Sequence, residues 1–483
     1  MKKFLEKAAL FCGLALATVF LLPADGFAKE DTIKEGVYAG EISLAGMTGE
    51  EAQTAINEYV NSLSEVEITL IAADDNEVVV TAGELGISWA NGEIIEEAIT
   101  LGTQGNIVER YKALKDLVHE NKVYPIELEF DITLIDTVLA ERCSKFDREA
   151  VDMSLVLQNG VFSTKEGRIG YLLDVESSID IVYDYLVADW DRQACSIKLQ
   201  VIETQPRGTE EELLQVKDIL GSFTSSYSTS AANRIGNIEN GARLINGVTV
   251  YPGDEFSTCD LVTPFSEANG YYMAASYISG KVVDSLGGGI CQVSSTLYNA
   301  VLLAELEVTE RHNHSMIVAY MDPSADAAIA ESSGKDLRFI NNTDYPIYVE
   351  SYTTADKTVT VNIYGVETRA EGRTVKYVSE VTETIAPTPD VITVDANLSL
   401  GIVSISDAHT GYKAKLWKVV YENGVEVSRE QVNYSSYKMT PRSATVGVAT
   451  ADPNAYNEIM AAIATGDIIH VRNVAAMLTA PAQ

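Results

Sequence analysis

The chain has 483 residues, of which 46% are hydrophobic and 22% charged, so it holds enough apolar material for several folded domains. Its formal net charge is −35, and a surface that acidic repels nucleic acid and anionic lipid. The composition therefore disfavours global disorder and a nucleic-acid partner, and it provides for several domains. The patterns along the chain lead us to expect a multidomain α+β protein.

The first 28 residues have the pattern of an export signal. Lysines stand among the first seven residues, residues 8–22 are apolar apart from one threonine, and Gly26 and Ala28 are small residues at the positions that a signal peptidase reads. The apolar run is shorter than the ~20 residues that span a bilayer, which disfavours a retained membrane anchor. We expect residues 1–28 to be a cleaved signal peptide, and the mature chain to be secreted or wall-associated with no stable membrane span.

Residues 35–205 contain an internal repeat. The segments 81–88 and 165–172 align on Gly-x-(Leu/Ile)-Gly, and each follows two strand-like runs and precedes a helical stretch. A helical pattern also leads into each copy. We expect two copies of a small α+β module, at 35–125 and 126–205. Two copies are too few for a solenoid, so a tandem pair of binding modules fits better.

The third predicted domain covers residues 206–370 and begins with a helical pattern at Glu210–Leu220. Asn246-Gly247 is typical of a hairpin turn, here between Arg243–Ile245 and Val248–Val250. Four further strands are expected, at Met316–Tyr320, Leu337–Ile340, Ile347–Ser351 and Val359–Tyr364.

The end of the chain has a different pattern. Residues 373–450 are dominated by strands, with a hairpin turn at Glu422–Gly424, and residues 451–483 form a tail with a short helix.

The most informative run is Gly287–Ala300, in which three glycines precede a cysteine and a helical pattern begins behind them. Gly287, Gly288 and Gly289 can adopt positive φ and let the backbone approach a ligand closely. If a helix begins near Cys291, its free amides and its dipole favour a thiolate there. Gln292 would then be placed to donate to an oxyanion.

A thiolate nucleophile also needs a base, and His312 and His314 lie about twenty residues further on. If that stretch is extended, both rings point to the same face. Either Asp326 or Asp336 could orient one of them. The residues thus support a hypothesis with Cys291 as nucleophile, His314 or His312 as base, and one of the two aspartates as orienter.

A structural interpretation of the same residues stays open. A cysteine behind glycines is often a small packing residue, and Cys259 could bridge Cys291 and remove the thiol. Arg311 could pair with an acid instead of binding a ligand. A metal at the two histidines lacks an evident third ligand, so we expect neither metal nor cofactor.

Tyr271 and Tyr272, just before the glycine run, are candidates for stacking on sugar rings, as are Trp89 and Tyr434. The alternative is that each is an ordinary core or strand residue, because aromatic side chains dominate protein cores.

These motifs resemble a known family. Residues 233–365 resemble the VanW domain of bacterial cell-surface proteins, a family named after glycopeptide-resistance gene clusters. The matching segments are Asn246-Gly247, Tyr251–Ser257, Gly287–Ala300, Arg311–Ser315, Asp336–Phe339 and Asn342–Ile347. The resemblance implies no settled activity for this domain.

The flanking regions resemble other wall-associated modules. The repeats are similar to peptidoglycan-binding modules that precede VanW domains, and residues 373–450 are similar to a G-five domain, which is implicated in binding N-acetylglucosamine. The resemblance implies a protein of a Gram-positive-type cell envelope whose partner is peptidoglycan or its N-acetylglucosamine-containing glycan.

Two functional hypotheses remain from the sequence. The first is a wall-binding adaptor without chemistry, in which the VanW-like domain recognises the wall. The second is a thiol-dependent hydrolase or transpeptidase that acts on peptide stems through Cys291 and His314.

Overall fold

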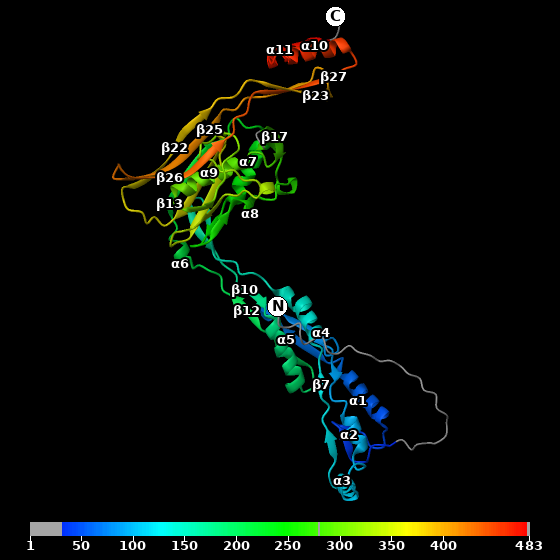
Figure 1. The fold of residues 1–483 in the computed structure, drawn as a ribbon. Helices are drawn as coiled ribbons and strands as arrows, with labels where there is room; N and C mark the ends of the chain where they lie inside the picture. Colours follow the sequence, from blue (N-terminus) through cyan, green and yellow to red (C-terminus); the bar gives the residue numbers. More distant parts are fainter. Residues whose placement is uncertain (1–30, 279–280, 481–483) are drawn as a thin grey trace. The chain divides into compact units, whose positions relative to one another are not determined.

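The computed structural model describes residues 31–278 and 281–480, which fold as two compact units (Figure 1). Unit 1 consists of Met1–Glu149 and Gly170–Thr204, and unit 2 of Ala150–Ile169 and Gln205–Gln483. The predicted signal peptide lies outside the described residues. Both units combine helices with several small sheets, which confirms the α+β, multidomain class.

Unit 1 is built from short elements around one core. Its α-helices are α1 (Gly49–Leu63), α2 (Ile94–Thr100), α3 (Ile107–His119), α4 (Ile132–Val138) and α5 (Val175–Asp184). Its strands are β1 (Val37–Ala39), β2 (Ile42–Ser43), β3 (Glu67–Ile71), β4 (Glu77–Thr81), β5 (Ser88–Trp89), β6 (Lys122–Tyr124), β7 (Leu128–Glu129), β10 (Gly170–Leu173), β11 (Cys195–Lys198) and β12 (Val201–Thr204). Helix α1 begins where Thr48 and Glu51 form a capping box, which satisfies two backbone amides that have no partner inside the helix.

The two halves of unit 1 are interleaved. Strand β11, from the second half, pairs in parallel with β3, from the first half, in a sheet of order β11-β3-β4. Residues of both halves also share one hydrophobic core, to which Ile56 and Leu186 belong. The segments expected as separate modules, 35–125 and 126–205, therefore do not have separate cores.

Unit 2 contains the glycine–cysteine run. Its first strands are β8 (Ser154–Gln158), β9 (Val161–Lys165), β13 (Asp218–Ser226), β14 (Val248–Val250), β15 (Glu255–Ser257), β16 (Met273–Ile278), β17 (Lys281–Leu286), β18 (Glu307–Glu310), β19 (Arg338–Ile340), β20 (Ile347–Thr353) and β21 (Thr358–Gly365). Its first helices are α6 (Glu210–Leu213), α7 (Ala232–Ile245), α8 (Thr258–Val262) and α9 (Ile290–Leu303).

Helix α9 is the centre of this domain. The sheet of order β13-β21-β20-β14 has α9 packed on β13 and β21, and α7 packed on β20. Every residue of α9 from Gln292 to Leu302 is buried. A helix that is covered on all sides is held by tertiary packing, so its first residues have a fixed position.

The structure corrects two predicted elements near the site. Arg243–Ile245 was expected as the first strand of a hairpin, but it ends helix α7, and Asn246 follows as the residue that closes that helix. Met316–Tyr320 was expected as a strand, but the described chain has no regular secondary structure there. Met316 and Val318 are buried, and this alternation of apolar residues gives the same pattern as a strand.

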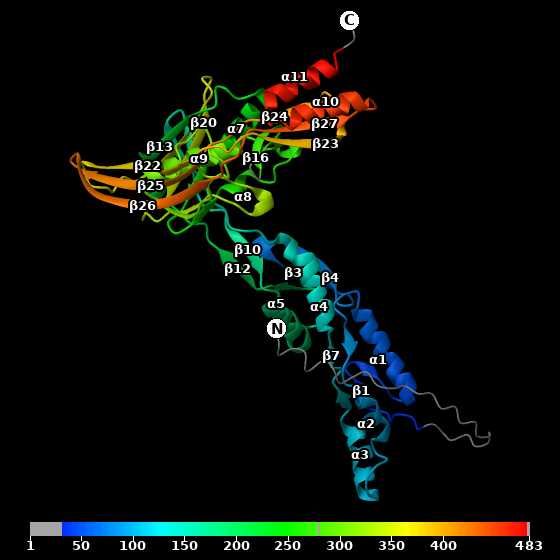
Figure 2. The ribbon, with the colours of Figure 1, turned by 45° about the horizontal axis from the view of Figure 1, so that its top comes forward.

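The C-terminal strands form what we call the β-module, residues 373–449. Its strands are β22 (Arg373–Ile385), β23 (Val391–Ser399), β24 (Val403–Ser406), β25 (Gly411–Glu422), β26 (Val425–Tyr437) and β27 (Ser443–Ala449). Strands β22, β25 and β26 form one sheet beside α9 (Figure 2). The predicted turn at Asn423-Gly424 joins β25 to β26, and both residues have positive φ.

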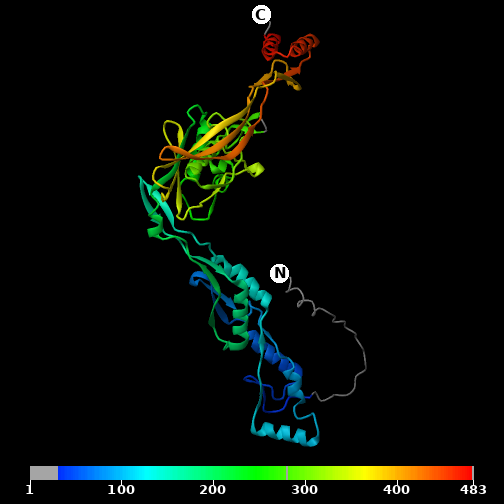
Figure 3. The ribbon, with the colours of Figure 1, turned by 60° about the vertical axis from the view of Figure 1, so that its left-hand side comes forward.

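Two helices, α10 (Pro453–Ile463) and α11 (Ile468–Leu478), follow the β-module and pack together at the end of its strands (Figure 3). Among residues 31–278 and 281–480, no helix has the length and apolar character to cross a membrane.

Candidate active site

The glycine run forms a tight entry into helix α9. Gly287 and Gly289 have φ of 77° and 107°, a region that residues with a side chain rarely adopt. A Cβ atom on Gly288 would lie 2.3 Å from the carbonyl oxygen of Ala274, so only glycine fits against this backbone. Gly289 is the residue that precedes the first turn of α9, and Cys291 is the second residue of that turn.

Cys291 is a free, partly buried cysteine. Its Sγ lies 3.4 Å from the carbonyl oxygen of Ile329, and the thiol interacts electrostatically with the side chain of His314. The helix begins at Ile290, as expected, so Cys291 sits where backbone amides and the helix dipole favour a negative charge.

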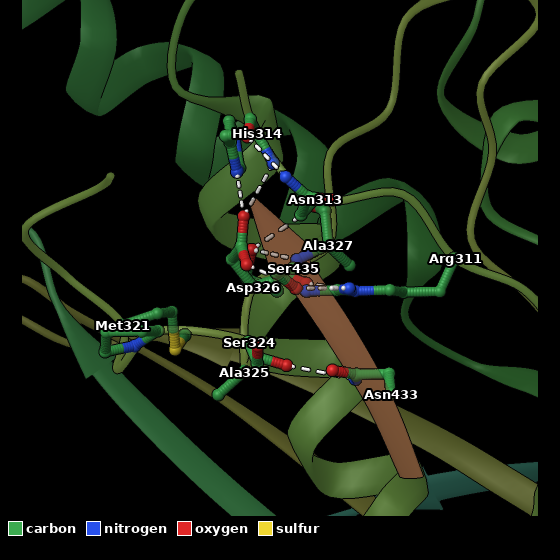
Figure 4. A network of polar contacts seen from close by, with 12 residues as sticks. Arg311, Asn313, His314, Met321, Ser324, Ala325, Asp326, Ala327, Asn433 and Ser435 are labelled. Atoms are coloured by element: carbon green, nitrogen blue, oxygen red, sulfur yellow. Dashed lines mark hydrogen bonds and ion pairs between the residues drawn. The ribbon is translucent and has the colours of Figure 1, made fainter. Parts of the chain in front are cut away.

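His314 is fixed by Asp326 (Figure 4). Nδ1 of the ring lies 2.6 Å from Oδ2 of Asp326, and the same oxygen accepts the backbone N–H of His314 at 2.7 Å. Both side chains are buried, with His314 8% and Asp326 0% exposed. Because Nδ1 is bound to the carboxylate, Nε2 is the ring nitrogen that is left for other contacts.

Asp326 is also paired with a cation. Arg311 donates to the carboxylate oxygen Oδ1 of Asp326 at 2.9 Å and to its backbone carbonyl at 2.7 Å. Arg311 was predicted to bind a ligand, but its side chain is buried and forms this ion pair. A buried carboxylate needs such partners, because an unpaired charge in the interior is very costly.

The electrostatics of the three residues are coupled. Burial alone would raise the pKa of the Cys291 thiol, but its hydrogen bond and charge interaction with His314 lower it below the usual value. Burial would lower the pKa of His314, whereas its hydrogen bonds to Asp326 and Cys291 raise it to about 9. Burial would raise the pKa of Asp326, and His314 and Arg311 lower it. The arrangement thus favours a thiolate beside an imidazolium that is held by a carboxylate.

Polar side chains of helix α9 hold the irregular segment that carries Asp326. Ser295 Oγ accepts the N–H of Ala327 at 2.9 Å, Ser294 donates to the carbonyl of Ala327 at 2.7 Å, and Asn299 donates to that of Ala325 at 2.8 Å. Sequence reasoning missed these residues. The signal was present, since polar residues recur within a helix that is buried on all sides.

Tyr320 is a further residue that the sequence did not single out. Its hydroxyl lies 3.4 Å from Nε2 of His314. Burial raises the pKa of Tyr320 well above its usual value, so the hydroxyl keeps its proton. The guanidinium of Arg234 lies over the Tyr320 ring, 5.7 Å from its centroid.

The other catalytic candidates lie in different surroundings. The side-chain amide of Gln292 is buried and committed, since it donates to Ser225 and to the carbonyl of Ser226 and accepts from Arg234. It is therefore not free to serve an oxyanion. Sequence spacing could not show this, because all three partners lie 58 to 67 residues away along the chain.

Asp336 and His312 do not join Cys291 in a triad. Asp336 accepts the backbone N–H groups of Cys259 and Leu337 and the hydroxyl of Ser257, and so holds the start of helix α8. Nε2 of His312 lies 2.9 Å from Oε1 of Glu310, and its side chain is 40% exposed. The two histidine rings lie in different surroundings, one partly exposed beside Glu310 and the other buried beside Asp326, and no strand forms over residues 311–320.

Of the ligand-binding candidates near the glycine run, Tyr271 is buried and its hydroxyl donates to the carbonyl of Val262 at 2.7 Å. It is a core residue and cannot stack on a sugar. Tyr272 is 53% exposed and stays available for such a contact. In the part of the chain that the structure describes, no group of three or more His, Cys, Asp or Glu side chains could hold a metal ion.

Comparison with known families accounts for three segments. Residues 78–193 match the model described as "Putative peptidoglycan binding domain", residues 233–364 match "VanW like protein", and residues 377–451 match "G5 domain". The site described above lies within the second segment, apart from its contacts with the β-module.

Two curated proteins are similar to parts of the chain. The uncharacterized protein YoaR of Bacillus subtilis is 31% identical over 186 residues, which are 38% of this chain and 60% of that protein. The vancomycin B-type resistance protein VanW of Enterococcus faecalis is 30% identical over 125 residues, which are 24% of this chain and 45% of that protein. Both matches span less than two thirds of the relative.

Two solved structures resemble the C-terminal part. The IgA1 protease G5 domain is 25% identical and HP0197-G5 is 20% identical; each match covers 16% of this chain, with 94% and 97% of the solved chain and TM-scores of 0.12 and 0.10. Peptidoglycan-binding and G5 domains imply a cell-wall or extracellular protein. The chain thus carries, in the order that the sequence predicted, a putative peptidoglycan-binding domain, a VanW-like domain and a G5 domain.

Proposed function

We propose that the VanW-like domain is a thiol-dependent acyl-transfer enzyme that acts on the peptide stems of peptidoglycan. Cys291 is the nucleophile, His314 the general acid and base, and Asp326 the group that orients His314. The observation that carries this proposal is the buried pair of His314 and Asp326, together with the interaction of His314 with Cys291 that lowers the pKa of the thiol. A nucleophile, a base and an orienter in that order are the parts of a thiol hydrolase.

The contacts support a two-step reaction. The Cys291 thiolate attacks the carbonyl carbon of a stem amide, and the C–N bond breaks as His314 gives its Nε2 proton to the departing amine. The product of this step is a thioester on Cys291. Water or the amine of a second stem then attacks the thioester, His314 accepts its proton, and the thiolate is released. Water gives hydrolysis, and an amine gives transpeptidation.

The flanking domains support the choice of substrate. A peptidoglycan-binding domain and a G5 domain on either side of the thiol domain would hold the chain on the polymer, through peptide or N-acetylglucosamine-containing glycan. Residues 1–28 would direct the chain out of the cell before cleavage. The similarity to a vancomycin resistance protein adds glycopeptide susceptibility as a phenotype to examine in a deletion strain.

The test compares two thiols of the same domain. Purified full-length protein is incubated with peptidoglycan fragments, and the stems are followed by mass spectrometry. We expect cleavage or exchange with the unmodified protein and with Cys259→Ala, and none with Cys291→Ala. Cys259 is the matched control because burial and nearby Asp336 raise the pKa of its thiol to about 12, which keeps it protonated.

A second measurement separates the enzyme from an adaptor. The alkylation rate of Cys291 by iodoacetamide is measured against pH. We expect the rate profile to give an apparent pKa below that of a free thiol. A Cys291→Ala protein that keeps the activity, or a Cys291 that titrates like free cysteine, would contradict the enzyme. If the full-length protein nevertheless binds peptidoglycan sacculi, the adaptor hypothesis replaces the enzyme hypothesis.

A further inference from the structure

The β-module touches the chain on both sides of His314. Asn313 donates to the carbonyl of Ser436 at 3.1 Å, and the N–H of Lys438 donates to the carbonyl of Ser315 at 2.7 Å. These two contacts lie on neighbours of His314 in the sequence. The segment that supplies the base is therefore seated on the end of strand β26.

Tyr437, the last residue of β26, reaches Asp326 itself. Its hydroxyl donates to Oδ1 of Asp326 at 2.5 Å and accepts the backbone N–H of Ser324 at 2.6 Å. The side chain is 1% exposed, and burial, followed by the charge of Asp326, raises the pKa of its hydroxyl. The hydroxyl therefore keeps its proton and remains a hydrogen-bond donor to the carboxylate.

A second contact of the module supports the same carboxylate indirectly. Ser435, also on β26, accepts a hydrogen bond from Arg311 at 2.9 Å, and Arg311 pairs with Asp326 Oδ1 (Figure 4). Asn433 adds a hydrogen bond to the carbonyl of Ser324 at 3.1 Å. Three alternate residues of strand β26 thus hold Asp326, the Arg311 that pairs with it, and Ser324 two residues before it.

We infer that the β-module is a working part of the thiol site and that Tyr437 is a positioning residue for Asp326. The inference rests on the proposed function, since it concerns how the same triad is aligned. Oδ1 of Asp326 is held by Tyr437 and Arg311, which leaves Oδ2 directed at Nδ1 of His314. A wall ligand that shifts β26 would consequently change the pKa of Cys291, and by linkage the protonation state of the thiol would change the affinity for that ligand.

The test uses the full-length chain and a readout that does not require turnover. The alkylation rate of Cys291 is measured against pH in the unmodified protein and in Tyr437→Phe, by mass spectrometry of the peptide that contains Cys291. Without the Tyr437 hydroxyl, the Asp326 carboxylate is less firmly oriented. Its hydrogen bond to the protonated His314 ring is therefore weaker. We expect the apparent pKa of Cys291 to rise, with the rate near pH 6.5 falling about tenfold for each pKa unit.

The matched control is Tyr412→Phe. Tyr412 lies directly opposite Tyr437 on strand β25, so the substitution makes the same chemical change in the same sheet. We expect its alkylation profile to match that of the unmodified protein. If Tyr437→Phe does not fold, Ser435→Ala replaces it, because that change removes a support of Arg311 while leaving the aromatic core intact.

The outcomes distinguish the two proposals. If the pH profile of Cys291 alkylation gives an apparent pKa below that of a free thiol in the unmodified protein and is the same in Tyr437→Phe, the inference is overturned and the proposed function stands. Where Ser435→Ala replaces Tyr437→Phe, the same comparison applies to Ser435→Ala. An ordinary thiol profile in the unmodified protein would overturn the proposed function itself. A shift in Tyr437→Phe and none in Tyr412→Phe would support the coupling of the module to the site.

Discussion

Nδ1 of His314 and Oδ2 of Asp326 lie 2.6 Å apart in a buried environment. This contact holds the ring by Nδ1 and leaves its other nitrogen, Nε2, for other contacts. It also stabilises the protonated ring, and the pKa of His314 rises to about 9 although burial acts in the opposite direction. The reactivity of the thiol therefore depends on a contact that the thiol itself does not make.

The first prediction concerns the base. Replacing His314 with Gln removes the group that lowers the pKa of Cys291, while burial, which raises it, remains. We expect the apparent pKa of the thiol to move up to or above the ordinary value, and the alkylation rate at pH 7 to fall at least about tenfold. His312→Gln is the control, because His312 bonds to Glu310 instead. A larger effect at His312 would show that the wrong histidine was assigned.

The second prediction separates the two aspartates. Asp326→Asn leaves a neutral amide that cannot stabilise the imidazolium, so we expect the turnover of peptide stems to fall by about 10²-fold or more. Asp336→Asn should leave the alkylation profile of Cys291 unchanged and cost about 1–3 kcal/mol of stability, because the backbone amides of Cys259 and Leu337 lose a charged acceptor. Equal losses of turnover in the two variants would contradict the assignment.

The third prediction concerns the glycine entry to helix α9. In Gly288→Ala the new methyl group meets the backbone carbonyl of Ala274, which cannot rotate away. We expect a loss of about 1–3 kcal/mol in the free energy of unfolding of unit 2 and slower alkylation of Cys291. Gly92→Ala is the control, since a Cβ there meets nothing within 4 Å. Thermal and urea unfolding measure the stability of both variants. A Gly288→Ala protein with unchanged free energy of unfolding would show that the turn is not tightly packed.

The fourth prediction concerns a partly buried ion cluster between the end of helix α9 and the β-module. Glu305 pairs with Arg369, Arg373 and Lys418, and against the effect of burial Arg373 and Lys418 lower the pKa of its carboxyl to about 2. Because the folded-state pKa lies below the usual value, the stabilisation is present above about pH 4.5 and is lost as the pH falls through about 2. Glu305→Gln should cost about 3 kcal/mol at pH 7 and far less near pH 2.

Urea unfolding at the two pH values checks this prediction. Glu426→Gln is the control, since Glu426 forms an exposed pair with Arg429 three residues away and should change stability little. A cost of Glu305→Gln that is the same at pH 7 and pH 2 would mean that the carboxylate charge does not supply the stabilisation.

Much of the organisation was readable from local patterns. The order of the domains followed from the resemblance to known families. The turn at Asn423-Gly424 and the helix that begins beside Cys291 were predicted because each depends on neighbours in the sequence. The strand expected at Met316–Tyr320 was wrong, since buried apolar residues in an irregular segment carry the same signal as a strand.

The sequence by itself determined a thiol at the start of a helix, two histidines and two aspartates as candidates. Only the tertiary structure decided that His314 and Asp326 contact each other and that Asp336 serves helix α8. The reason is that the segment carrying these groups has no regular geometry of its own. Its shape is imposed by hydroxyl and amide groups of α9 and by Tyr437, which is 111 residues from Asp326 along the chain. Contacts over such separations leave no periodic pattern in the sequence.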